Sequence, residues 1–172
     1  MTYHSIARVY VGTYEKYNNG SLAGEWIDLE AHDKESFGEA IRELHRDEAD
    51  PEYMYRNREG FAALLFGECG PKDGAWQALE AWKDMDEDRR EAFGLFVEKG
   101  SHDLSVAAEA FGKAYQGRWD SREDFAEQLA EDIGETFAEM WPHNCIDWER
   151  AARDLFLIGE YWEEDGHVFR NL

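Results

Sequence analysis

The stretch IARVYVGTYEKYNNGSLAGEWIDL, residues 6–29, indicates the class of fold because it contains two segments typical of β-strands. Both segments, Ile6–Thr13 and Gly24–Leu29, are rich in the β-branched and aromatic residues that favour strands. Asn18, Asn19 and Gly20 lie between them, and these residue types favour a turn. We therefore expect two neighbouring strands joined by a hairpin-like connection.

Helical patterns and a few more strands follow along the chain. Residues 34–45 carry apolar side chains at helical spacing, with Asp33 as the expected helix cap. In a later helix that begins after Ser121, we expect Phe125, Leu129 and Ile133 to form the buried face. The remaining helices are expected at 75–85, 86–99, 104–111 and 148–156, and the remaining strands at 52–60, 115–120 and in a hairpin at 158–169.

This order of elements predicts an α+β fold of short antiparallel sheets and helices. Three small modules in a row are expected. They are an N-terminal α/β module at residues 1–61, a central, mainly helical module at 62–111, and a C-terminal α/β module at 112–172.

The charge of the chain excludes several classes of partner. Its 172 residues include 39 Asp and Glu against 18 Lys and Arg, which gives a formal net charge of −21. Phosphate backbones and anionic lipids repel such a chain, so we expect no direct binding to nucleic acid or to a membrane. Cationic protein surfaces are the expected partners. Two cysteines, no long apolar run and no secretory leader predict a cytoplasmic protein.

No pattern of residues points to catalysis. The six histidines are scattered, and no phosphate loop, dinucleotide-binding glycine motif or paired zinc-ligand motif is present. Asp84, Asp86 and Asp88 resemble the start of a calcium loop, but Arg89 and Leu95 stand where that loop needs glycine and glutamate. We therefore expect no catalytic residue, no metal, no cofactor and no enzymatic activity.

The spacing of the acidic residues is more informative than their number. A first acidic row repeats every four residues, and so does a second. The first is Glu35, Glu39, Glu43 and Asp47; the second is Glu123, Glu127, Glu131, Glu135 and Glu139, unless Gly134 ends the helix before the last two. On a helix this step is about 6 Å of rise and about 40° of rotation, so the carboxylates would share one face. Like charges at this spacing oppose helix formation, which favours selection for a function.

The alternative is that both rows are ordinary solvated helix faces. Arg42 and Arg46 follow members of the first row by three residues and partly neutralise it, whereas only Arg122 lies near the second. A count adds weight to the functional interpretation. Duplex DNA carries about one charge per 1.7 Å, so the 39 carboxylates match the phosphates of about 20 base pairs, and a dimer those of about 40.

Several blocks of the sequence, in this order, resemble the ArdA antirestriction proteins: residues 7–29, 44–61, 115–134, 151–156 and 164–171. The resemblance implies a protein of mobile genetic elements that mimics bent B-form DNA. It would occupy the DNA-binding groove of type I restriction–modification enzymes, inhibiting restriction, and modification can be blocked as well. It further implies an elongated, curved arrangement of three modules, a homodimer formed through the C-terminal region, and neither cofactor nor catalytic residue.

The resemblance also indicates which residues would imitate phosphates. Acids in the matched blocks or in the two rows are the candidates: Glu35, Glu39, Glu43, Asp47, Glu48, Asp50, Glu52, Glu123, Asp124, Glu127, Glu131, Asp132, Glu135 and Glu139. The region after Gly134 corresponds to the family's antirestriction motif, near the dimer contact, although its residues ETFAEMWPHNCIDW (135–148) depart from the family pattern. There, Phe137, Met140 and Trp141 would form either the dimer contact or module core.

Two rival functions remain open. An acidic, chaperone-like protein could bind another basic DNA- or RNA-binding protein, and any polyanion would then displace it. An acidic enzyme or salt-adapted domain would fit the six lysines against twelve arginines, and would unfold at low salt.

Overall fold

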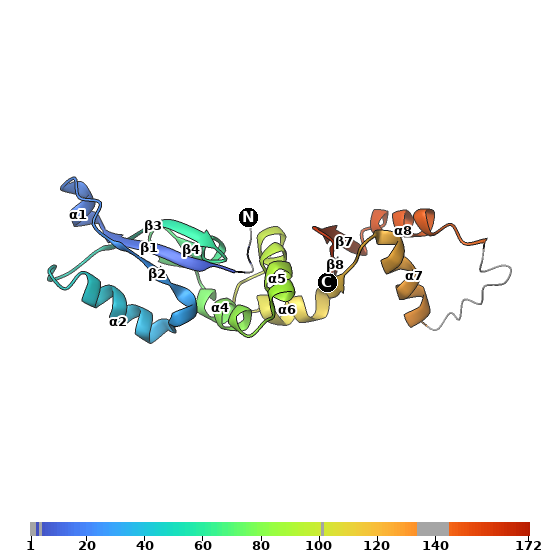
Figure 1. Cartoon of the computed structure of the whole chain (residues 1–172), viewed down its shortest axis with the longest axis horizontal. Helices are drawn as coiled ribbons and strands as arrows, with labels where there is room; N and C mark the ends of the chain where they lie inside the picture. The colour runs from blue at the N-terminus through green and yellow to red at the C-terminus, as the bar shows by residue number, and fades with distance from the viewer. Residues whose placement is uncertain (1–2, 4, 101, 134–144) are drawn as a thin grey trace. The chain divides into compact units, whose positions relative to one another are not determined.

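The computed structural model describes residues 3, 5–100, 102–133 and 145–172, and it confirms an α+β fold of small antiparallel sheets and helices (Figure 1). Its contacts divide the chain into two compact units, residues 1–111 and 112–172. The three modules and their elongated arrangement stay predictions. Among the described residues, no helix is long and apolar enough to cross a membrane.

The first unit is built on the antiparallel sheet β2-β1-β3, in which β1 is Ala7–Thr13, β2 is Glu25–Asp28 and β3 is Tyr53–Gly60. Val9 lies opposite Ile27 of β2 and Arg58 of β3, so the expected pairing of the first two strands is confirmed. Their connection is longer than a tight hairpin. It contains a short helix, α1 (Tyr14–Asn18), whose Lys16 amide donates to the Thr13 side chain.

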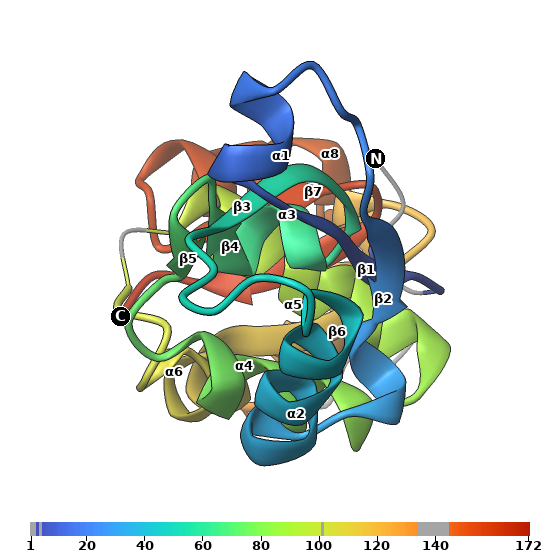
Figure 2. The same ribbon diagram turned by 90° about the vertical axis from the view of Figure 1, so that its left-hand side faces the viewer.

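Helix α2 (Lys34–Leu44) follows a single 3-10 turn, η1 (Leu29–Ala31), and lies along one side of this sheet (Figures 1 and 2). The expected cap is confirmed, because Asp33 accepts from the Ser36 amide at 2.8 Å while the Ser36 hydroxyl oxygen accepts from the Asp33 amide. Phe37 and Ile41 form its buried face. The polar face of α2 is consequently directed to solvent.

The rest of the first unit is helical apart from one small hairpin. Its elements are α3 (Ala62–Leu65), β4 (Phe66–Gly67), β5 (Gly70–Pro71), α4 (Ala75–Lys83), α5 (Glu87–Lys99) and the start of α6 (Ala107–Ala114). Trp82 of α4 stacks on Phe61 with 5.3 Å between ring centroids, and its indole N–H donates to the Tyr3 carbonyl. Gly94 of α5 lies against the Tyr3 side chain, where a Cβ would come within 2.3 Å.

The second unit packs two helices, α7 (Arg122–Asp132) and α8 (Trp148–Leu157), against the antiparallel sheet β6-β8-β7. The strands are β6 (Tyr115–Arg118), β7 (Tyr161–Glu164) and β8 (His167–Arg170), and the last two form the expected hairpin. Its turn residues, Asp165 and Gly166, both have positive φ. Phe125, Tyr161 and Val168 form the hydrophobic core of this second unit.

One expectation for α7 is wrong. Phe125 is buried and Leu129 packs against the core, but the side chain of Ile133 is 74% exposed. The helix ends at Asp132 and Ile133 is its C-cap, one turn beyond Leu129, so the side chain of Ile133 lies past the core against which Leu129 packs.

Candidate functional site

The first acidic row begins on the solvent face of α2. Glu35, Glu39 and Glu43 are all exposed, as the helical spacing predicts. The amide and hydroxyl of Ser36 donate to Asp33, which lowers the pKa of that carboxyl group. Within the row, Glu43 forms an ion pair with Arg46. The expected neutralisation is therefore present at one position.

The first row continues into the turn between α2 and β3, where the chain's own lysine meets it. Nζ of Lys16, on α1, lies 2.9 Å from Oδ1 of Asp47 and 3.2 Å from Oε1 of Glu48. The hydrogen bond to Asp47 raises the pKa of Lys16, and the same bond lowers the pKa of Asp47. Asp47 remains 63% exposed, whereas the Glu48 side chain is 7% exposed and also accepts from the Thr13 hydroxyl. Glu48 thus contacts this chain rather than solvent.

The same turn contains a group of residues whose types could bind a metal ion. Ligand atoms of His45, Asp47 and Glu48 lie within 4.8 Å of one another. However, Nζ of Lys16 also lies 3.0 Å from Nδ1 of His45, so the lysine ammonium already contacts all three potential ligands. The cluster is therefore arranged around an internal cation. Asp50 and Glu52, farther along the turn, are exposed.

The second acidic row starts at the amino-terminal end of α7. Ser121 caps the helix by accepting from the Asp124 amide, and its hydroxyl donates to the Asp124 carboxylate at 2.6 Å. Glu127 and Glu131 are exposed, and Glu123 is half-buried. Among the residues that the structure describes, Glu123, Glu127 and Glu131 have no ion pair. Asp132, beside the row, is exposed and accepts from the side-chain amide of Gln128.

Arg122, the one cation expected near this row, is bound elsewhere. Its guanidinium lies 3.1 Å from a carboxylate oxygen of Glu163 on β7 and 4.8 Å from the centre of the Phe156 ring. The described members of the second row therefore keep more of their charge than the first row, in which Glu43 and Asp47 both have basic partners.

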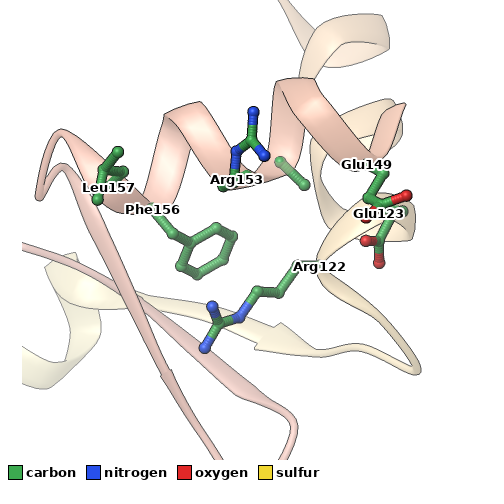
Figure 3. Close-up of a pocket in the computed structure, with 7 residues that line it drawn as sticks. Arg122, Glu123, Glu149, Arg153, Phe156 and Leu157 are labelled. Atoms are coloured by element: carbon green, nitrogen blue, oxygen red, sulfur yellow. The ribbon is translucent and has the colours of Figure 1, made fainter. Parts of the chain in front are cut away.

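A groove of about 430 Å³ runs between α7 and α8 beside the second row (Figure 3). Glu123 and Glu149 both lie at the end of the groove away from Leu157, and Phe156 contributes an apolar wall. Sequence reasoning missed Glu149, whose only local signal is its place in the first turn of α8. Arg122 and Arg153 also line the groove, so two arginines of this chain balance the charges of its two carboxylates.

The remaining candidates lie outside the described residues. These are Glu135 and Glu139 of the second row and the apolar residues Phe137, Met140 and Trp141. Thus the structure places the first row in the unit 1–111 and the described members of the second row in the unit 112–172.

Comparison with known families decides what kind of protein carries these rows. A family model described as antirestriction protein (ArdA) matches residues 9–169, nearly the whole chain. The chain belongs to the ArdA family. The resemblance found in the sequence is therefore confirmed. Membership of this family implies an antirestriction function, which is that of an inhibitor rather than of an enzyme. A search of the curated proteins found no match to this ArdA protein.

Proposed function

We propose that this ArdA protein mimics B-form DNA and competes with DNA for the binding groove of a type I restriction–modification enzyme. It thereby inhibits restriction, and it blocks modification wherever the same groove serves both reactions. The observation that carries the proposal is the second acidic row, whose described members Glu123, Glu127 and Glu131 lie on one helix with no ion pair to any described residue.

The spacing within a row supports this mechanism. A four-residue step along a helix rises about 6 Å. One strand of duplex DNA carries a phosphate about every 3.4 Å along its axis, so each step spans roughly two phosphates. Lysines and arginines that bind phosphates in the groove would find carboxylates at comparable intervals. Because the carboxylates are fixed on folded helices, the enzyme does not need to deform its ligand, as it does when it bends DNA.

Such binding would recognise charge and shape rather than base sequence. No single carboxylate should dominate, because exposed charge pairs each contribute only about 0.2–1 kcal/mol. We further infer that the protein acts in the cytoplasm without a cofactor, and as a homodimer joined near Phe137, Met140 and Trp141. The exposed apolar side chain of Ile133 directly precedes that segment and favours an apolar contact there.

Cleavage of plasmid DNA tests the proposal. A purified type I enzyme is mixed with unmodified plasmid and increasing amounts of the protein, at two DNA concentrations. We expect inhibition at near-equimolar protein and enzyme, and weaker inhibition at the higher DNA concentration. Complete cleavage at large excess of the protein would contradict the proposal for that enzyme. It would favour the acidic, chaperone-like binder of another basic DNA- or RNA-binding protein.

A further inference from the structure

A lysine of the chain itself, Lys16, forms ion pairs at the end of the first acidic row with Asp47 and the neighbouring Glu48. Lys16 lies on α1, 29 residues before His45 in the chain, and its side chain is 19% exposed. Its Nζ lies 3.0 Å from Nδ1 of His45, 2.9 Å from Oδ1 of Asp47 and 3.2 Å from Oε1 of Glu48. Three acceptors from one turn therefore converge on one ammonium group.

The elements around this group hold the turn against β1 and α1. From β1, the Thr13 hydroxyl donates to Oε1 of Glu48 at 2.7 Å. From the start of β3, the Tyr53 ring packs 6.0 Å from the His45 ring. The Tyr14 amide donates to the Glu52 carbonyl, which ties the far end of the turn to α1. Lys16 is the one basic side chain that the described residues place in ion-pair contact with Asp47 and Glu48.

Glu48 makes this lysine necessary. Its side chain is 7% exposed, and one of its carboxylate oxygens has no hydrogen-bond partner among the described residues. A buried carboxylate without a nearby positive charge is strongly unfavourable, so removing Lys16 would drive Glu48 towards solvent. Asp47, next to it in the chain, would then repel it. The turn that carries Asp47, Asp50 and Glu52 could not keep its present position.

We propose that Lys16 is a positioning residue of the carboxylate surface. Its ammonium, bound by His45, Asp47 and Glu48, fixes the turn of residues 46–52 so that Asp47, Asp50 and Glu52 are presented to the partner. This inference rests on the proposed function, because it assumes that these exposed carboxylates meet a cationic groove. It means that the positive charge of Lys16 is needed for the protein to imitate the negatively charged DNA.

Net charge alone and this proposal predict opposite effects on inhibition when Lys16 is removed. Lys16→Met changes the net charge from −21 to −22, and so does the matched control Lys34→Met at the exposed first residue of α2. If only total charge mattered, both variants would inhibit a type I enzyme at least as well as the wild type. We expect Lys34→Met to do so and Lys16→Met to need about tenfold more protein, because its loosened carboxylates must be ordered on binding.

Amide hydrogen exchange reports the position of the turn without any partner. In Lys16→Met we expect faster exchange at the amides of Tyr14 and Glu48, which donate to the carbonyls of Glu52 and His45. Exchange within α5 should stay unchanged, which shows that the unit remains folded. In Lys34→Met, all of these amides should exchange as in the wild type.

A double variant covers the case in which Lys16→Met does not fold. Lys16→Met/Glu48→Gln removes the buried charge together with its cation, and glutamine can still accept from the Thr13 hydroxyl. We expect amide protection and inhibition to return to within about twofold of Glu48→Gln alone. This rescue would show that Lys16 acts by compensating a charge.

Two results would overturn the proposal: Lys16→Met that inhibits as well as Lys34→Met, or unchanged protection of the Tyr14 and Glu48 amides. If the wild type inhibits no type I enzyme, the proposed function fails, and the exchange data still decide whether Lys16 holds the turn. If exchange rises but inhibition is unchanged, Lys16 holds the turn without positioning carboxylates for the partner, and the proposal is wrong.

Discussion

Replacing Glu123, Glu127 and Glu131 of α7 with glutamine removes three carboxylates that have no ion pair among the described residues. Each therefore offers its whole charge to a partner. At about 0.2–1 kcal/mol for an exposed ion pair, the triple variant should lose about 0.6–3 kcal/mol of binding free energy. This loss corresponds to about a threefold to 150-fold weaker inhibition, because about 1.4 kcal/mol is a factor of ten.

A matched control separates this effect from net charge. Glu59, Asp154 and Glu160 are also exposed or half-exposed, but they pair with Arg8, Arg150 and Arg170. Neutralising these three also changes the net charge from −21 to −18, yet it removes charges that the chain already balances. We therefore expect this second triple variant to inhibit within about twofold of the wild type.

The assay is the inhibition midpoint for cleavage by a type I enzyme, measured for both triple variants at one salt concentration. Circular dichroism confirms that both are folded. Equal losses in the two variants would refute the reasoning, because net charge alone would then explain binding. Abolished inhibition in a single Glu→Gln variant would refute it too, since one residue would dominate.

Three more predictions concern pH, packing and salt. Burial and the neighbouring Lys16 lower the pKa of His45, so as the pH falls the unfolded chain binds a proton on this histidine before the folded chain does. The free energy of unfolding should therefore be highest above about pH 6.5 and should fall as the pH drops towards the lowered pKa. Urea titrations should show a smaller fall in His45→Gln. Gly94→Ala should lower the melting temperature measured by calorimetry, because the added Cβ would lie 2.3 Å from the Tyr3 side chain. This clash should outweigh the preference of helices for alanine over glycine, which is about 1 kcal/mol. An unchanged or raised melting temperature would mean that Tyr3 moves aside freely. The dissociation constant of the complex between the protein and the enzyme, measured by calorimetry without DNA, should rise steeply between low and high salt, and a salt-independent dissociation constant would argue against charge recognition.

Local signals in the sequence predicted most elements of the fold. Asp33 and Ser121 cap α2 and α7 through bonds to residues three positions away, so neighbouring residue types sufficed to locate both helices. The short helix α1 was missed because one hydrogen bond to Thr13 begins it, while the following Asn and Gly residues indicate only a turn. Ile133 was misplaced because a helical pattern does not show at which residue the helix ends.

The candidate site was only partly predictable for a different reason. Spacing placed Glu35, Glu39 and Glu43 on one face, because helix geometry relates them locally. The burial of Glu48 and its contact with Lys16 join residues 32 positions apart, and no local pattern reports such a contact. The direction of Arg122 towards Glu163 likewise depends on how α7 packs on the sheet.

Mutual exclusion of the protein and DNA on the enzyme tests the central claim most directly. A fluorescent duplex is bound to a type I restriction–modification enzyme, and its anisotropy is followed as the protein is added. DNA mimicry predicts that the protein releases the duplex completely, with or without a recognition sequence in the duplex, and that the apparent affinity of the protein falls in proportion as duplex is added. A stable complex that contains enzyme, duplex and protein together would contradict it.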